Sequence, residues 1–228
     1  MDSNHTNYSA LGMSTKEVQV YEQIKQDILN DKFEPGTILV ERKLTEQYNV
    51  SRSPVRYALR QLVKDGLLEG EPGKGIIVPV YTLEDILEVY DLLEVLQVYA
   101  LQISMKNFNI ITDARLEKIL EETRRHTVDG DLAERMKWDI KFHEFIIHSV
   151  NNKRLDMMFE MLLNQKIRFD VASFDDVNHA ENSNDQHQKI FEAIRARDVE
   201  ASVAAMKEHE QYIKKYYIDK LVIGRYNL

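Results

Sequence analysis

Four side chains in the C-terminal half of the sequence have the types and spacing of a metal site. Asp139 and His143 are four residues apart, so they lie on one face of a predicted helix. His187 and His209 fall on the apolar faces of two later predicted helices. Unpaired polar groups inside a helical bundle cost free energy, and one divalent cation would satisfy all four groups. These ligands suit zinc, nickel or manganese.

Three other interpretations of these side chains stay open. Each His could be a hydrogen-bonded core residue, or the metal could be purely structural. A metal with open coordination positions could also activate water in a hydrolase-like enzyme. The sequence contains no HExxH motif or comparable general base, so we predict no catalytic residue and no enzyme.

A second group with chemical potential is a basic segment near the N-terminus. Between positions 42 and 64 there are six Lys or Arg residues against one Glu, in a chain whose net charge is −8. A local basic cluster in an acidic chain is typical of a DNA-binding surface. Arg52 and Arg56 are four residues apart, and Arg60 continues the same predicted helical face.

The elements that would position these arginines form the pattern of a winged helix-turn-helix. Apolar periodicity and turn residues predict helices over 17–31, 42–48 and 54–64. Ser51 and Ser53 are both suitable helix caps. Residues 67–69 and 76–78 are expected to be strands joined by a Gly-rich hairpin. The second helix of such a motif enters the major groove, and Gly73 at the wing tip would allow close approach to the minor groove.

The rest of the chain is predicted to be helical. Six helices are expected, over residues 83–106, 113–127, 131–151, 153–173, 183–197 and 199–220. The predicted fold is therefore mainly α, with a winged helix-turn-helix domain over 15–80, an all-helical bundle over 81–228, and a flexible tail over 1–14. The sequence has no Cys, no apolar run that could span a membrane and no signal-peptide pattern at its N-terminus, so we expect a cytoplasmic protein.

The first domain resembles the GntR family of bacterial transcription regulators. The resemblance rests on a run of motifs over residues 33–78: Phe33, Pro35-Gly36-Thr37, Leu44, Val50-Ser51-Arg52-Ser53-Pro54-Val55-Arg56, Ala58-Leu59, Leu62, Gly66-Leu67, Gly75 and Val78. It implies that operator DNA is contacted by Arg42, Ser51, Arg52, Ser53, Arg56 and Gly73.

The second domain resembles the FCD effector domain of FadR-like members of that family. The matching segments are Asp139-Ile-Lys-Phe-His143, Asn151, His187 leading into Phe191-Glu-Ala-Ile194, and Met206-Lys-Glu-His209. The resemblance implies a metal ion that helps to bind a small organic acid, and six helices are similar to the VanR-type branch. Leu93 stands where such domains often carry Arg, and Gln97 stands where they often carry Glu. We therefore expect a small-molecule effector such as a carboxylate, held by the metal, with Leu93 in contact with its carbon skeleton.

These observations together predict a one-component regulator, most often a repressor in this family. One recognition helix reads only a few base pairs, so we expect a homodimer on a palindromic operator. A small-molecule effector is expected to modulate operator binding.

Overall fold

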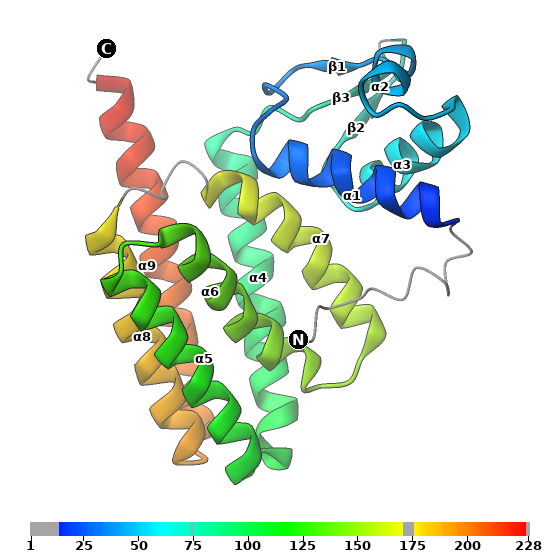
Figure 1. Cartoon of the computed structure of the whole chain (residues 1–228). Helices are drawn as coiled ribbons and strands as arrows, with labels where there is room; N and C mark the ends of the chain where they lie inside the picture. Colours follow the sequence, from blue (N-terminus) through cyan, green and yellow to red (C-terminus); the bar gives the residue numbers. More distant parts are fainter. Residues whose placement is uncertain (1–13, 74, 171–175, 227–228) are drawn as a thin grey trace. The chain divides into compact units, whose positions relative to one another are not determined.

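The structure is a computed structural model that describes residues 14–73, 75–170 and 176–226. It divides into two compact units, residues 1–80 and residues 81–228, each with its own hydrophobic core. The predicted flexible tail lies almost entirely outside the described residues. Figure 1 shows that helices make up most of both units and that the strands belong to the first, which confirms the predicted fold class.

The first unit is a three-helix assembly with a small sheet. Its helices are α1 (Thr15–Leu29), α2 (Glu41–Gln47) and α3 (Arg52–Lys64). Ser14 and Glu17 form a capping box that begins α1. The recognition helix α3 begins two residues before the predicted start, because Ser51 takes an extended conformation and serves as its N-cap residue.

The sheet contains one more strand than the sequence predicted. Strand β3 (Gly75–Ile77) pairs antiparallel with both β1 (Ile38–Leu39) and β2 (Glu69–Glu71). The turn between β2 and β3 is the predicted wing. Gly73 has a φ of +82°, a left-handed conformation that residues with a Cβ rarely adopt.

The second unit is a bundle of six helices, as predicted. They are α4 (Leu83–Ser104), α5 (Ile110–Val128), α6 (Leu132–His148), α7 (Lys153–Asp170), α8 (Val177–Arg195) and α9 (Val199–Tyr226), with a short 3₁₀ helix η2 (Met105–Asn107). In Figure 1, α9 lies along α4 and α8, and α5 lies along α6 and α8. None of the described helices is both long enough and apolar enough to cross a membrane.

Within the bundle, α5 and α8 start several residues before their predicted positions, and side-chain caps explain both starts. Asn109 accepts hydrogen bonds from the backbone N–H groups of Ile111 and Thr112, which starts α5 before the predicted position 113. Asp176 accepts from the N–H of His179, which starts α8 at Val177 rather than at 183. His179 therefore belongs to a helix, although its polar surroundings in the sequence indicated a loop.

The core of the bundle brings together apolar side chains from all six helices. Among its fully buried members are Tyr90, Leu101, Leu116, Phe142, Phe159, Ile190, Phe191 and Met206. Burying side chains of this size contributes roughly 1.5–3 kcal/mol each to stability. The polar residues of the predicted metal site lie within this apolar environment, so their partners decide what they can do.

Candidate functional site

The recognition helix separates a basic face from an apolar face. Val55, Leu59 and Leu62 are essentially inaccessible to solvent and pack in the core of the first unit. Arg52, Arg56 and Arg60 are all exposed on the outward side. The predicted orientation of α3 is confirmed by this burial pattern, and it leaves the arginines free to meet a ligand outside the protein.

Arg56 is not isolated on this face. Its Nε donates to Glu41 Oε1 at 2.9 Å and its Nη2 donates to Glu41 Oε2 at 2.9 Å, so the guanidinium and the carboxylate form a two-point ion pair. The hydrogen bond from Arg56 lowers the pKa of the Glu41 carboxyl. Glu41, at the start of α2, is a residue that the motif comparison did not select.

The remaining predicted DNA contacts surround the recognition helix. Arg42, Ser51, Ser53 and Gly73 are all exposed. The Ser51 side chain makes no capping hydrogen bond to α3, so its hydroxyl is not committed to that role. Their contact with operator DNA stays a prediction.

In the second unit, the structure brings three of the four predicted metal ligands together. His143 comes from α6, His187 from α8 and His209 from α9, and one nitrogen of each lies within 4.8 Å of the others. All three are buried, and His187 is completely inaccessible. His187 Nε2 lies 3.1 Å from His209 Nε2.

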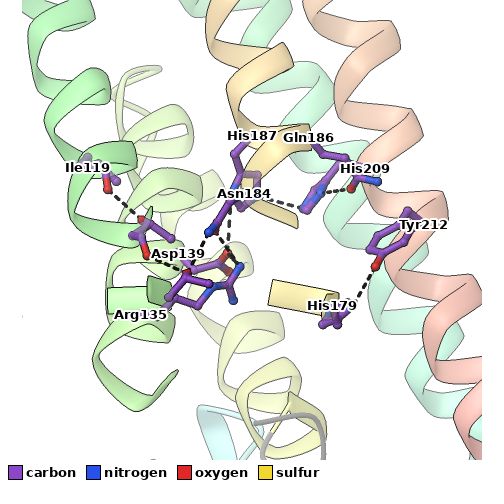
Figure 2. A network of polar contacts seen from close by, with 11 residues as sticks. Ile119, Arg135, Asp139, His179, Asn184, Gln186, His187, His209 and Tyr212 are labelled. Carbon is purple, nitrogen blue, oxygen red and sulfur yellow. Dashed lines mark hydrogen bonds and ion pairs between the residues drawn. The ribbon is translucent and has the colours of Figure 1, made fainter. Parts of the chain in front are cut away.

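Asp139 lies at the edge of this cluster rather than in it. Its Oδ1 is 3.6 Å from His187 Nδ1, too long for a hydrogen bond, and it accepts from Arg135 Nη2 at 2.9 Å. Arg135 Nη2 also contacts the side-chain oxygen of Asn184 at 3.3 Å, and Figure 2 shows these groups meeting beside His187. Burial opposes the ionisation of Asp139, but the surrounding positive charges, with that of Arg135 the strongest, together outweigh it and hold the pKa of the carboxyl well below its usual range.

The hydrogen-bonding pattern of the histidines fits a cation. Burial lowers the pKa of His187 and of His209 well below the usual value, so both rings are neutral and able to act as ligands near pH 7. His209 Nδ1 donates to Gln186 Oε1 at 2.9 Å, which leaves the lone pair on Nε2 (Figure 2). If His187 Nε2 donates to that lone pair, His187 Nδ1 becomes a buried acceptor, and none of the described residues donates a hydrogen bond to it. A cation between the two Nε2 atoms would instead let His187 carry its proton on Nδ1, facing Asp139.

A pocket lies beside the histidine cluster. Side chains from α6, α7, α8 and α9, together with the α8 cap, line it: Leu132, Arg135, Met136, Asp139, Lys166, Asp176, His179, Ala180, Ser183, His209, Glu210 and Ile213. Arg135 and Lys166 give it two cationic groups. Arg168 on α7 is buried over the Tyr81 ring and is not among the lining residues.

The structure adds two residues that sequence reasoning did not select. His179 lines the pocket, and its ring stacks on that of Tyr216 with a centroid distance of 3.7 Å. Glu210 is 2% exposed, next to His209 in the chain, and also lines the pocket. A capping rule applied to Asp176 would have placed His179 on a helix. Leu93, by contrast, is packed in the core and is not among the lining residues, so the pocket gives its predicted effector contact no support.

Comparison with known protein families identifies the family to which this chain belongs. Residues 16–78 match the domain described as bacterial regulatory proteins, gntR family, and residues 88–212 match the FCD domain. The chain is also 31% identical, over 84% of its length and 86% of the relative, to an uncharacterised HTH-type transcriptional regulator, YdhC, of Bacillus subtilis. The chain is a GntR-family transcription regulator with an FCD domain.

Other members of the GntR family extend this comparison. The transcriptional repressor RspR of Escherichia coli is 28% identical over 86% of each chain, and the gluconate operon repressor of Bacillus licheniformis is 28% identical over 87% of this chain and 84% of that one. The solved structure of E. coli McbR/YncC superimposes with a TM-score of 0.77 at 22% identity, over 92% of this chain and all of that one, so the two share a fold. As a GntR-family regulator the chain is a DNA-binding protein and not an enzyme, which removes the hydrolase alternative.

Proposed function

We propose that this GntR-family regulator binds operator DNA as a homodimer. A small carboxylate bound at a metal ion in its FCD domain would change its affinity for the operator. The observation that carries this proposal is the meeting of three buried histidines from three helices, one of which, His209, lines a pocket that also holds Arg135 and Lys166.

The metal would be held by His143, His187 and His209. Nitrogen ligands from three neutral imidazoles suit zinc, nickel or manganese, and three protein ligands leave coordination positions for a small molecule. Asp139 was predicted as the fourth ligand. In the geometry described above, it faces Nδ1 of His187, where it would orient that ring and contribute negative charge.

The effector would enter the pocket with its carboxylate toward the metal. Arg135 and Lys166 would complement its charge, and a charge-assisted hydrogen bond of this kind is worth roughly 1.5–3 kcal/mol. The family match supports a small-molecule effector, and relatives named as repressors support repression as the mode of action.

The homodimer would use an apolar stripe on α4. Leu92, Val95, Tyr99 and Ile103 are 51%, 61%, 43% and 38% exposed, and their spacing places them along one side of the helix. A second copy of the chain is the occupant that the first unit requires, because a single recognition helix reads only a few base pairs. The same stripe on two copies of the chain can pack together across a two-fold axis, as the interface of a symmetric dimer requires.

The test compares metal-loaded and metal-stripped protein. The probe is DNA from upstream of the regulator's own gene, and acetate, lactate, gluconate and citrate are titrated while operator binding is followed by fluorescence anisotropy. We expect at least one carboxylate to change operator affinity of the zinc-loaded protein and none to change that of the stripped protein. Equal responses with and without metal would refute the metal-bound effector. Metal removal that unfolds the FCD domain, with no carboxylate response in either form, would favour a structural metal instead.

A further inference from the structure

A chain of three buried polar side chains links one of the proposed metal ligands, on α6, through α4 to α9. Gln97 on α4 lies between His143 on α6 and Glu210 on α9, and the three are 2%, 4% and 2% exposed. Gln97 Nε2 donates to Glu210 Oε1 at 2.5 Å, and Gln97 Oε1 is hydrogen-bonded to His143 Nδ1. Burying polar groups in an apolar core is costly, and these two hydrogen bonds offset part of that cost. The second oxygen of Glu210, Oε2, is buried without a hydrogen-bond partner among the described residues.

The chemistry of the three groups fixes the direction of every hydrogen bond. Glu210 Oε1 faces the NH₂ group of Gln97, and that group can only donate. The amide oxygen of Gln97 must then face His143, and an oxygen can only accept. His143 therefore carries its proton on Nδ1 and its lone pair on Nε2. That is the form of the ring that can bind a metal ion through Nε2.

We propose that Gln97 and Glu210 are positioning residues of the metal site, with Gln97 holding the ring of His143 and Glu210 holding the amide of Gln97. This inference rests on the proposed metal site and names neither residue as a ligand. It gives each of the three histidines a polar group facing Nδ1: Gln97 for His143, Asp139 for His187 and Gln186 for His209. Such partners set both the tautomer and the orientation of a ligand ring.

The role of Glu210 follows from what its loss would permit. Without an acceptor on α9, the Gln97 amide can turn over and present its NH₂ group to His143 Nδ1. The ring would then be held with its lone pair on Nδ1 and its proton on Nε2, the wrong form for binding. Loss of a partner of this kind typically costs about 10- to 100-fold in metal affinity.

The experiment measures Zn²⁺ affinity of the full chain by competition with a chromophoric chelator, and the visible absorption of Co²⁺ bound to the same protein. Gln97→Leu should weaken Zn²⁺ binding by about 10- to 100-fold and alter the Co²⁺ spectrum. Glu210→Leu should have a smaller effect in the same direction. Glu210→Gln keeps an acceptor oxygen and should retain wild-type Zn²⁺ affinity. The double variant Gln97→Glu with Glu210→Gln should also bind Zn²⁺ like the wild type, because the new carboxylate at position 97 accepts from both neighbours.

A matched control separates positioning from packing. Ser202 is also buried on α9, but its hydroxyl donates to the backbone oxygen of Asp198, so Ser202→Ala should leave Zn²⁺ affinity unchanged. Wild-type affinity in Gln97→Leu, in a protein whose binding is lost in His143→Ala, would overturn the positioning role and leave the metal site intact. Absence of Zn²⁺ binding by the wild type would overturn both. If Gln97→Leu fails to fold, equal affinities of Glu210→Leu and Glu210→Gln would overturn the positioning role.

Discussion

The Nε2 atoms of His187 and His209 face each other at 3.1 Å across the interface between α8 and α9. Both rings are buried and neutral near pH 7, so the pair can offer nitrogen lone pairs to a cation. His143 approaches the same place from α6.

Removing two of the three histidines should abolish metal binding. We expect wild-type protein purified without chelator to contain about one divalent ion per chain, and His143→Ala with His187→Ala to contain none, since one imidazole cannot hold the ion. Elemental analysis after gel filtration is the measurement. His148→Ala is the matched control, because His148 lies on the same helix as His143 and contacts Asp156 instead of the cluster. Full metal content in the double variant would contradict the site.

Glu210 gives a second prediction, on the pH dependence of stability in chelator-treated protein. Burial raises the pKa of Glu210 to about 7 from 4.5, although Lys166, Gln97 and Lys214 partly oppose the shift and Glu94 reinforces it. The folded state therefore binds a proton that the unfolded state has lost between pH 4.5 and 7, so this group stabilises the protein at low pH and loses that contribution as the pH rises through 7.

Glu210→Gln should remove this dependence. We expect the variant to gain stability relative to wild type as the pH rises from 5 to 8, on the order of a few kcal/mol. Urea unfolding of the two metal-free proteins at several pH values measures the difference. Because His187 and His209 are present in both proteins, their own titration cancels. A constant difference across this range would show that Glu210 is not buried as described.

The second unit also shows what the sequence could and could not predict about the site. Helical spacing alone indicated that Asp139, His143, His187 and His209 point inward, because polar residues within an apolar stripe share its direction. The contacts of Gln97 could not be predicted from helical spacing. Its partner Glu210 is 113 positions away, and periodicity fixes the face of each helix but not its rotation and height against a neighbour. The ion pair of Asp139 with Arg135 was missed although it follows the i, i+4 rule.

In the first unit, the apolar pattern predicted all three helices and the wing, but strand β1 escaped it. Strand β1 contains only Ile38 and Leu39, too few residues to show an alternation of apolar and polar side chains. The strand exists because β3 supplies its hydrogen bonds. Glu41 was likewise overlooked. Its importance comes from a contact with Arg56 on the next helix, which no local pattern records.

The exposed stripe of α4 gives a prediction about assembly. Val95→Asp with Tyr99→Asp would place two charges in the centre of the proposed interface, so we expect the wild type to be a dimer and this variant a monomer with weakened operator binding. Light scattering coupled to gel filtration gives the mass. Ile110 is 84% exposed at the start of α5, outside the stripe, and Ile110→Asp should stay dimeric. A monomeric wild type, or a variant that remains dimeric, would exclude this surface.

The last prediction concerns how Glu41 controls the recognition helix. Arg52 and Arg56 are both expected to contact bases, yet Arg56 is held by a two-point pair with Glu41. An exposed ion pair is weak, and a bidentate contact with guanine is stronger, so DNA should be able to take Arg56 away from Glu41. The carboxylate would then remain near the phosphates as a repulsive charge. We therefore expect Glu41→Gln to tighten operator binding by roughly a few-fold, because it removes the repulsion between one carboxylate and the DNA phosphates.

Arg52→Ala and Arg56→Ala should each weaken specific binding on the order of ten- to a hundredfold. Anisotropy titrations on operator and scrambled DNA, at two salt concentrations, distinguish base contacts from phosphate contacts, because a phosphate contact weakens binding to both sequences and lowers the salt dependence. Weaker operator binding in Glu41→Gln would show that Glu41 instead holds Arg56 in its binding orientation, and unchanged binding in both arginine variants would remove α3 as the reading helix.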